Sequence, residues 1–304
     1  MSDFTFTVFT PAYNRAGLLP RVHQSLLEQT FGDFEWLIVD DGSSDDTRSV
    51  VEPWIAGSPF PVRYLYKENG GKHTALNVGI REARGRYFVV ADSDDWLLPE
   101  ALETLLDVWN GQSGREKLTG VCGLFQYPDG QVVGTRFPED GMRSNAIDLR
   151  LRHGVKGDKV GFSRIEVLRE FPFPEEFGRV YLPESIVWNR ISQRYDTVFV
   201  NRMIGVKEYQ QHGITDRAGL NSARNPLAYR LKAAELVTGS RRIPFLERCR
   251  CLLTATKCSI KAGVSPFVST GGIDPLLTVG SLPVALVLLA RDRMRAARMR
   301  QRSA

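Results

Sequence analysis

Cysteine is scarce in this chain of 304 residues, and so are long apolar segments. A chain of this length can bury a sizeable core without a disulfide framework, so we expect its four cysteines to be reduced thiols in a cytosolic protein. The Cys249-x-Cys251 pair does not have zinc-ligand spacing. The sequence begins without the apolar segment of a secretion signal. Its balance of 42% hydrophobic and 25% charged residues excludes a disordered, collagen-like or polytopic membrane protein.

Two common nucleotide-binding motifs are also absent. There is no Walker A spacing and no G-x-G-x-x-G after the first predicted strand, so we expect no dinucleotide cofactor. The formal net charge of +5 comes entirely from residues 291–304, which contain six arginines and one aspartate. Because the rest of the chain is neutral, we expect no nucleic-acid partner.

The first 110 residues alternate between strand and helix patterns. Short β-rich runs are separated by segments whose apolar residues recur at helical spacing. The predicted strands are 4–10, 34–39, 62–66 and 86–91, and the predicted helices are 15–29, 46–55, 74–83 and one that opens after Pro99. This order predicts an α/β fold with a mostly parallel sheet flanked by helices.

Polar clusters follow three of these strands. Asp40–Asp46 follows the second strand, Asn69–Lys72 the third and Asp92–Asp95 the fourth. In parallel sheets, ligands bind beyond the carboxyl ends of the strands. We therefore expect the three clusters to converge at one edge of the sheet and to form the functional site.

The Asp92–Asp95 cluster holds three carboxylates that repel one another unless a cation lies among them. Mg²⁺ and Mn²⁺ prefer such oxygen ligands and leave positions open for phosphate oxygens. A metal-bound diphosphate is then the natural ligand. The alternative is an acidic helix N-terminus that interacts with the helix dipole.

The other two clusters each allow a structural and a functional interpretation. Asp40–Asp46 is either a turn with a helix cap or a site where a carboxylate accepts from a nucleobase or a ribose. Tyr13, just past the first strand, either stacks on that base or packs at the rim. Asn69–His73 is either a turn or a phosphate contact, in which Lys72 brings positive charge to a helix start.

Four segments together resemble the nucleotide-sugar-binding half of family 2 glycosyltransferases. The segments are Thr10–Arg15, Val39–Asp45, Asn69–Lys72 and Ala91–Asp95, and their order and spacing match as a set. The resemblance is strong over about residues 4–110 and weaker to about residue 230. It implies a GT-A fold and an inverting, metal-dependent transfer from a nucleoside-diphosphate sugar.

The resemblance also assigns roles to residues of the donor site. Asp41 would hold the base, expected to be uracil, in a pocket lined by Pro11 and Tyr13. Asp92 would contact the ribose or the diphosphate, and Asp94 would bind Mg²⁺ or Mn²⁺. Lys72 lies where the family often has a donor-contacting residue. Asp92 and His212 are further candidate metal ligands, although His212 can equally be a loop histidine without such a role.

An inverting transfer needs a base that takes the proton of the acceptor hydroxyl. The family usually supplies it as an acidic residue at a helix start, often an Asp that follows a Glu. Here the segment reads Pro183-Glu184-Ser185, so Ser185 replaces the second acid. Our candidate base is therefore Glu184, whose alternative role is helix capping. Trp96 either lines an acceptor pocket or begins the core of the next helix.

The pattern becomes helical after Gly219. We expect a catalytic domain at 1–220 and a helical C-terminal extension at 221–304. Residues 276–290 are uncharged and mostly apolar but too short for a membrane span, and the basic tail 291–304 follows. Residues 276–302 are either a peripheral anchor on an anionic membrane surface or a last core helix with a basic end.

The sequence thus predicts an inverting glycosyltransferase that moves a sugar, expected to be UDP-linked, to a hydroxyl of a glycan or lipid-linked acceptor. We expect a role in cell-envelope or exopolysaccharide synthesis, in the cytoplasm or on the inner face of the cell membrane. One rival is a sugar-nucleotide nucleotidyltransferase, although residues 4–15 lack its phosphate loop. The other is an inactive nucleotide-sugar-binding scaffold, which the change at Ser185 keeps open.

Overall fold

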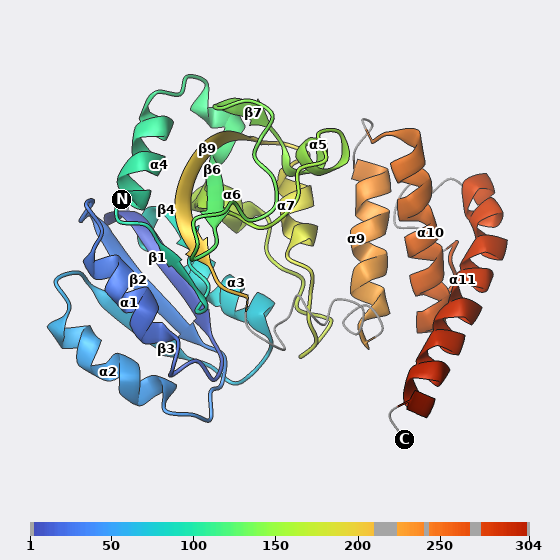
Figure 1. Cartoon of the computed structure of the whole chain (residues 1–304), viewed down its shortest axis with the longest axis horizontal. Helices are drawn as coiled ribbons and strands as arrows, with labels where there is room; N and C mark the ends of the chain where they lie inside the picture. Colours follow the sequence, from blue (N-terminus) through green and yellow to red (C-terminus); the bar gives the residue numbers. More distant parts are fainter. Residues whose placement is uncertain (1–2, 210–223, 240–242, 268–274, 303–304) are drawn as a thin grey trace. The chain divides into compact units, whose positions relative to one another are not determined.

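The computed structural model describes residues 3–209, 224–239, 243–267 and 275–302 (Figure 1). The chain divides into two compact units, Met1–Arg217 and Ala218–Ala304. We describe each unit by itself.

The first unit begins with alternating strands and helices. The strands are β1 (Phe4–Ala12), β2 (Phe34–Asp40), β3 (Val62–Tyr66) and β4 (Gly85–Val90), and the helices between them are α1 (Leu19–Leu27), α2 (Thr47–Gly57) and α3 (Lys72–Glu82). The strands lie in the order β3-β2-β1-β4, and each neighbouring pair is parallel. Every residue of β2 is buried, as expected for a strand covered on both faces. The predicted α/β alternation and parallel pairing are therefore confirmed in this half.

Beyond β4 the sheet becomes mixed. Further strands are β5 (Asp95–Leu97), β6 (Leu118–Gln126), β7 (Met142–Ser144), β8 (Lys159–Arg164) and β9 (Asp196–Lys207). The strand β8 pairs antiparallel with both β4 and β6, whereas β6 and β9 are parallel. Both β5 and β7 pair antiparallel with β9. The result is one nine-stranded sheet whose parallel part carries the predicted polar clusters.

Helices cover the two faces of the parallel part. Alternate residues of β1 point to opposite faces, as strand geometry requires. Phe6 and Val8 belong to the core formed with α1, α2 and α4 (Ala101–Asn110). Phe9 points the other way and its ring meets Gly79 of α3. The remaining described helices of this unit are a 3-10 turn (Arg115–Lys117), α5 (Ala146–Leu151), α6 (Ile165–Glu170) and α7 (Ser185–Ile191).

The second unit contains three described helices: α9 (Pro226–Gly239), α10 (Phe245–Ala262) and α11 (Pro275–Arg302). The middle helix α10 contacts both others. Its buried face includes Leu252, and Thr256 shares a 2.7 Å hydrogen bond with Ser281 of α11. Among the described helices, none has the length and apolar character needed to cross a membrane.

The contact between α3 and β1 leads to a test of the packing. A methyl group added at Gly79 would lie 2.2 Å from the ring of Phe9, which is fully buried. We expect Gly79→Ala to lower the free energy of unfolding by about 1–3 kcal/mol, because an overpacked core has to shift. Urea denaturation measures this change.

The matched control is Gly57→Ala at the end of α2, where nothing lies within 4 Å of the added carbon. There the substitution restricts the unfolded chain and should be neutral or stabilise by about 0.5 kcal/mol. Equal effects of the two substitutions would contradict the packing of α3 on β1.

Candidate active site

Hydrogen bonds join the loops that follow β1, β2 and β4. The backbone N–H of Asn14 donates to Ser43 Oγ at 2.8 Å, and the N–H of Ser44 donates to Asn14 Oδ1 at 2.8 Å. Asn14 has a left-handed backbone (φ 54°), a conformation that asparagine tolerates better than most residues. Arg15 Nε donates to Ser93 Oγ at 3.1 Å. These bonds hold the three loops together at one edge of the sheet, as the sequence predicts for the loops after β2 and β4.

Asp41, directly after β2, is buried and fixes the loop that precedes α3. Its carboxylate accepts from the backbone N–H groups of Gly70 (2.9 Å) and Gly71 (2.7 Å) and from Lys67 Nζ (2.6 Å). Its backbone carbonyl accepts from Asn69 Nδ2 at 2.8 Å. Asp41 thus organises the loop between β3 and α3. Its predicted contact with the base stays a prediction.

The loop held by Asp41 ends at Gly71, whose φ of 97° suits glycine. The next residue, Lys72, begins α3. Its Nζ lies 2.7 Å from Asp92 Oδ1, donates to Asp92 Oδ2 at 2.9 Å and lies 2.7 Å from Glu184 Oε1. Burial disfavours the charged ammonium, but the two carboxylates outweigh it and raise the pKa of Lys72 above its usual range. The structure therefore brings three of the predicted residues into one contact.

Glu184 occupies the N-cap position of α7, yet its side chain makes no capping hydrogen bond. The carboxylate instead contacts Lys72. About a quarter of each of the two side chains is exposed, so a substrate can reach this contact. The capping role considered for Glu184 is not observed.

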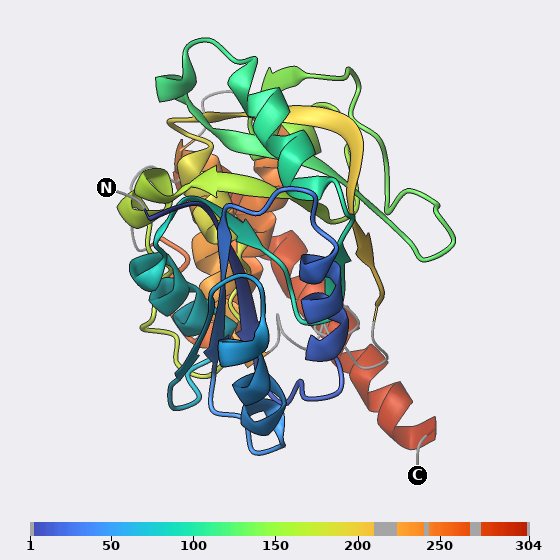
Figure 2. The ribbon, with the colours of Figure 1, turned by 90° about the vertical axis from the view of Figure 1, so that its left-hand side faces the viewer.

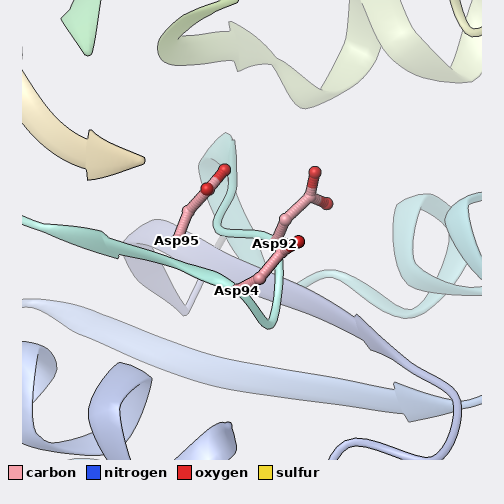
Figure 3. A group of neighbouring side chains, drawn as sticks. All are labelled: Asp92, Asp94 and Asp95. Atoms are coloured by element: carbon pink, nitrogen blue, oxygen red, sulfur yellow. The ribbon is translucent and has the colours of Figure 1, made fainter. Parts of the chain in front are cut away.

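The carboxylates of Asp92, Asp94 and Asp95 project to the same side of the chain after β4 (Figure 3). One oxygen from each lies within 4.8 Å of the others. In the described part of the chain, no hydrogen bond or ion pair reaches the partly exposed side chain of Asp94. Asp92 Oδ1 is buried and, among the described residues, has no donor in hydrogen-bond geometry, although Lys72 Nζ lies 2.7 Å away.

The charges around Asp92 favour its ionised form. Burial opposes ionisation, but Lys72, Lys207 and Arg15 together lower the pKa of this carboxyl. A buried, ionised oxygen without a hydrogen-bond donor and an unpaired neighbouring carboxylate suit a hard divalent cation. The donor set therefore fits Mg²⁺ or Mn²⁺, and the predicted binding of such an ion by Asp94 and Asp92 stays a prediction.

Asp95 has a different environment because it belongs to β5. The pairing of β5 with β9 places Asp95 opposite Lys207, whose Nζ donates to Asp95 Oδ2 at 2.9 Å. Burial raises the pKa of Asp95 to about 7, and the charges of Asp92 and Asp94 add to this effect while Lys207 opposes it. Lys207 thus already supplies a cation to the third carboxylate of the cluster.

The remaining predicted residues that the structure describes are Pro11, Tyr13 and Trp96. Pro11 is buried near the end of β1, and the Tyr13 side chain beyond it is half exposed, as base stacking requires. Trp96 is in β5 rather than in the following helix, and its ring lies 4.0 Å from the Arg21 guanidinium. His212 lies outside the described residues.

Three basic residues of the site were not predicted from the sequence: Arg15, Lys67 and Lys207. Arg15 lies three positions after the end of β1 and Lys67 directly follows β3, so their place in the loops was a usable signal. Lys207 is 112 positions from Asp95. No local pattern predicts that pairing, because it depends on the register between β5 and β9.

Comparisons with known proteins agree with this geometry. The profile of the family described as "Glycosyl transferase family 2" matches residues 7–162. Chondroitin synthase from Escherichia coli is 41% identical over 101 residues, which are 33% of this chain and 15% of that protein. The curated relatives compared share only 10% to 35% of their own length with this chain.

Two solved structures have a similar fold. Staphylococcus aureus TarS 1-349 in complex with UDP-GlcNAc superposes with a TM-score of 0.64, covering 92% of this chain and 80% of that one at 18% identity. The mannosyltransferase PcManGT from Pyrobaculum calidifontis, in complex with GDP-Man and Mn²⁺, superposes with a TM-score of 0.57. The match covers 97% of this chain and 81% of that one at 21% identity. The predicted GT-A class of fold is therefore confirmed, and a helical C-terminal region is present.

The contacts of Asp41 provide a test of the loop. In Asp41→Asn, the amide group would turn a donor toward a backbone N–H or toward Lys67, and the charge opposite Lys67 would be lost. We expect the free energy of unfolding to fall by about 1.5–3 kcal/mol, as for other hydrogen bonds to charged groups. Chemical denaturation measures it.

The control is Asp46→Asn at the start of α2. Asp46 is exposed and makes no side-chain capping bond, so its change should stay within about 0.5 kcal/mol. If Asp41→Asn were equally mild, Asp41 would not be the residue that holds this loop.

Proposed function

The chain belongs to glycosyltransferase family 2, and on that premise we propose that it transfers a sugar from a nucleoside-diphosphate sugar to an acceptor hydroxyl with inversion at the anomeric carbon. The supporting observation is the contact of Lys72 with both Asp92 and Glu184. It joins the candidate donor-binding loops to the candidate base at the carboxyl ends of the parallel strands, where ligands of such sheets bind.

The proposed donor carries UDP. Pro11 and Tyr13 would line the pocket for the base, Asp41 would hold it, and Asp92 with Lys72 would face the ribose and the diphosphate. The similar fold of TarS, which was solved with UDP-GlcNAc, supports a nucleotide-sugar donor. PcManGT was solved with GDP-Man, so the choice of uracil comes from the resemblance of the sequence motifs.

Glu184 is the proposed general base. The acceptor oxygen attacks the anomeric carbon while the bond from that carbon to the diphosphate oxygen breaks, and the acceptor proton passes to the Glu184 carboxylate. The products are the glycosylated acceptor and the nucleoside diphosphate. General-base catalysis of this kind contributes about 10²- to 10⁴-fold to the rate.

Asp94 and Asp92 are the proposed ligands of Mg²⁺ or Mn²⁺, with His212 as a further candidate. When bound, the cation offsets negative charge on the leaving diphosphate. Asp94 is suited to this role because no other described group pairs with it, whereas Lys207 holds Asp95. A solved neighbour of similar fold contains Mn²⁺.

The proposed acceptor is a glycan or a lipid-linked sugar in cell-envelope or exopolysaccharide synthesis. Relatives that match over about a third of this chain are named chondroitin synthase and hyaluronan synthase. Their names support a saccharide hydroxyl as the group that receives the sugar. The catalytic domain is proposed to extend to about residue 220.

We place the remaining residues, 221–304, in a helical extension that contacts the inner face of the cell membrane. One side of α11 packs with buried Thr278, Ala285 and Leu289. The exposed side carries apolar residues without an intervening charge up to Arg291: Val279, Val284, Leu286 and Val287. An apolar surface followed by an arginine-rich segment suits an anionic membrane surface.

The metal assignment is tested with Asp94→Ala. We expect this variant to lose Mn²⁺-dependent binding of UDP because a ligand oxygen is removed, while its unfolding midpoint stays near that of the wild type. Calorimetric titration with UDP, with and without Mn²⁺, measures the loss. The control is Asp107→Ala on the exposed side of α4, which should bind as the wild type does. Unchanged Mn²⁺-dependent binding in Asp94→Ala would remove Asp94 from the metal site.

The membrane contact is tested by sedimentation with vesicles. The full chain should bind vesicles of phosphatidylglycerol and phosphatidylcholine better than phosphatidylcholine alone, and less well at high salt. Val287→Glu places a charge on a side chain that is 68% exposed and should reduce binding at least tenfold. Ile55→Glu on α2 adds the same charge at an exposed apolar position of the first unit and should reduce binding much less. Equal binding by the two variants would contradict a contact through α11.

A further inference from the structure

The position of Lys72 is not explained by the helix that it begins. The N-terminal end of a helix carries partial positive charge and favours anions, yet α3 starts with a lysine. Its ammonium lies 2.7 Å from an oxygen of Asp92 and 2.7 Å from an oxygen of Glu184. The two carboxylates therefore supply the negative charge that stabilises this ammonium, which the N-terminal end of α3 does not supply.

The main chain at Lys72 is fixed by the loop before it. Asp41 binds the N–H groups of Gly70 and Gly71, and Gly71 adopts the positive φ that turns the chain into α3. The side chain of Lys72 thus extends from a defined position. A lysine whose backbone is fixed in this way can restrict the position of a more mobile side chain that contacts it.

Glu184 is such a partner. Its carboxylate does not cap α7, and within the described residues its one ion-pair contact is with Lys72. Without that contact, a partly exposed glutamate can rotate about three side-chain torsions and turn its carboxylate toward solvent. This rotation costs little free energy, because water solvates the carboxylate. The Lys72 ammonium keeps the Glu184 oxygen within two hydrogen-bond lengths of Asp92.

We propose that Lys72 is a positioning residue for the general base, which holds the Glu184 carboxylate toward the donor in addition to any contact that Lys72 makes with the donor itself. The proposal rests on the proposed function, because it requires Glu184 to be the base. Misplacing a catalytic group by about 1 Å can cost about 10²-fold in rate. The effect of removing Lys72 should therefore appear in kcat at saturating donor, where a loss of donor affinity has no influence.

The test is a double-mutant cycle with Lys72→Met and Glu184→Gln. UDP release is followed from the most rapidly used of UDP-N-acetylglucosamine, UDP-glucose, UDP-galactose and UDP-glucuronate, with saccharide acceptors or water. We expect Glu184→Gln to lower kcat about 10²-fold or more and Lys72→Met about 10- to 100-fold. The double variant should be no slower than Glu184→Gln, because Lys72 has no base left to position.

Two further variants separate positioning from a general structural effect. Lys72→Arg keeps a cation that can donate to both carboxylates and should recover part of the kcat lost in Lys72→Met. Arg81→Met removes an exposed cation at the other end of α3 and should leave kcat unchanged. All variants should keep the unfolding midpoint within a few degrees of the wild type.

Two outcomes would overturn the proposal while leaving the proposed base in place. The first is multiplication of the two single effects in the double variant, since Lys72 would then act independently of Glu184. The second is a higher donor KM in Lys72→Met with unchanged kcat, since Lys72 would then bind only the donor. Full kcat in Glu184→Gln would instead remove the base from the proposed function, and the positioning role with it.

Discussion

The buried carboxylate of Asp41 is the contact on which the arrangement of the site depends. It lies at the end of β2 and binds two backbone N–H groups and one ammonium of the loop that follows β3. That loop determines where α3 begins, and α3 begins with Lys72. From Lys72 the chain of contacts continues to Asp92 after β4 and to Glu184 before α7. The contacts of one carboxylate at a strand end are thus connected, through Lys72, to two further segments of the chain.

The balance of charge at this edge of the sheet distinguishes the carboxylates from one another. Lys67 pairs with Asp41, Lys72 with Asp92 and Glu184, and Lys207 with Asp95. Because a buried charge is costly without a partner, these pairs allow several acids to remain close together. Asp94 differs because no described group pairs with it. Within one short acidic segment, Asp92 and Asp95 each have a basic partner and Asp94 has none among the described residues. This difference is the physical basis for proposing that Asp94 binds a metal ion.

Much of the fold could be predicted from local patterns, and part of the site could not. Buried apolar runs separated by helical periodicity predict the parallel half, and the polar residues after those strands predict which loops meet. The antiparallel strand β5 was not predicted, because three residues give no periodic signal. The pairing of Asp95 with Lys207 and the contact of Lys72 with Glu184 emerge only from the folded chain, because each joins residues that lie far apart in the sequence. The roles assigned to the site residues come from the family resemblance and stay predictions.

The most direct test of the central claim is nucleotide binding by the wild-type chain. UDP, GDP, CDP and TDP would each be titrated by calorimetry in the presence and absence of Mn²⁺, with thermal shift as a second readout. The account predicts that one nucleotide, UDP, binds more tightly than the others and that its binding requires the metal ion. Absence of binding by all four would contradict it, since the acidic residues at the strand ends would then be only caps and turns of the fold.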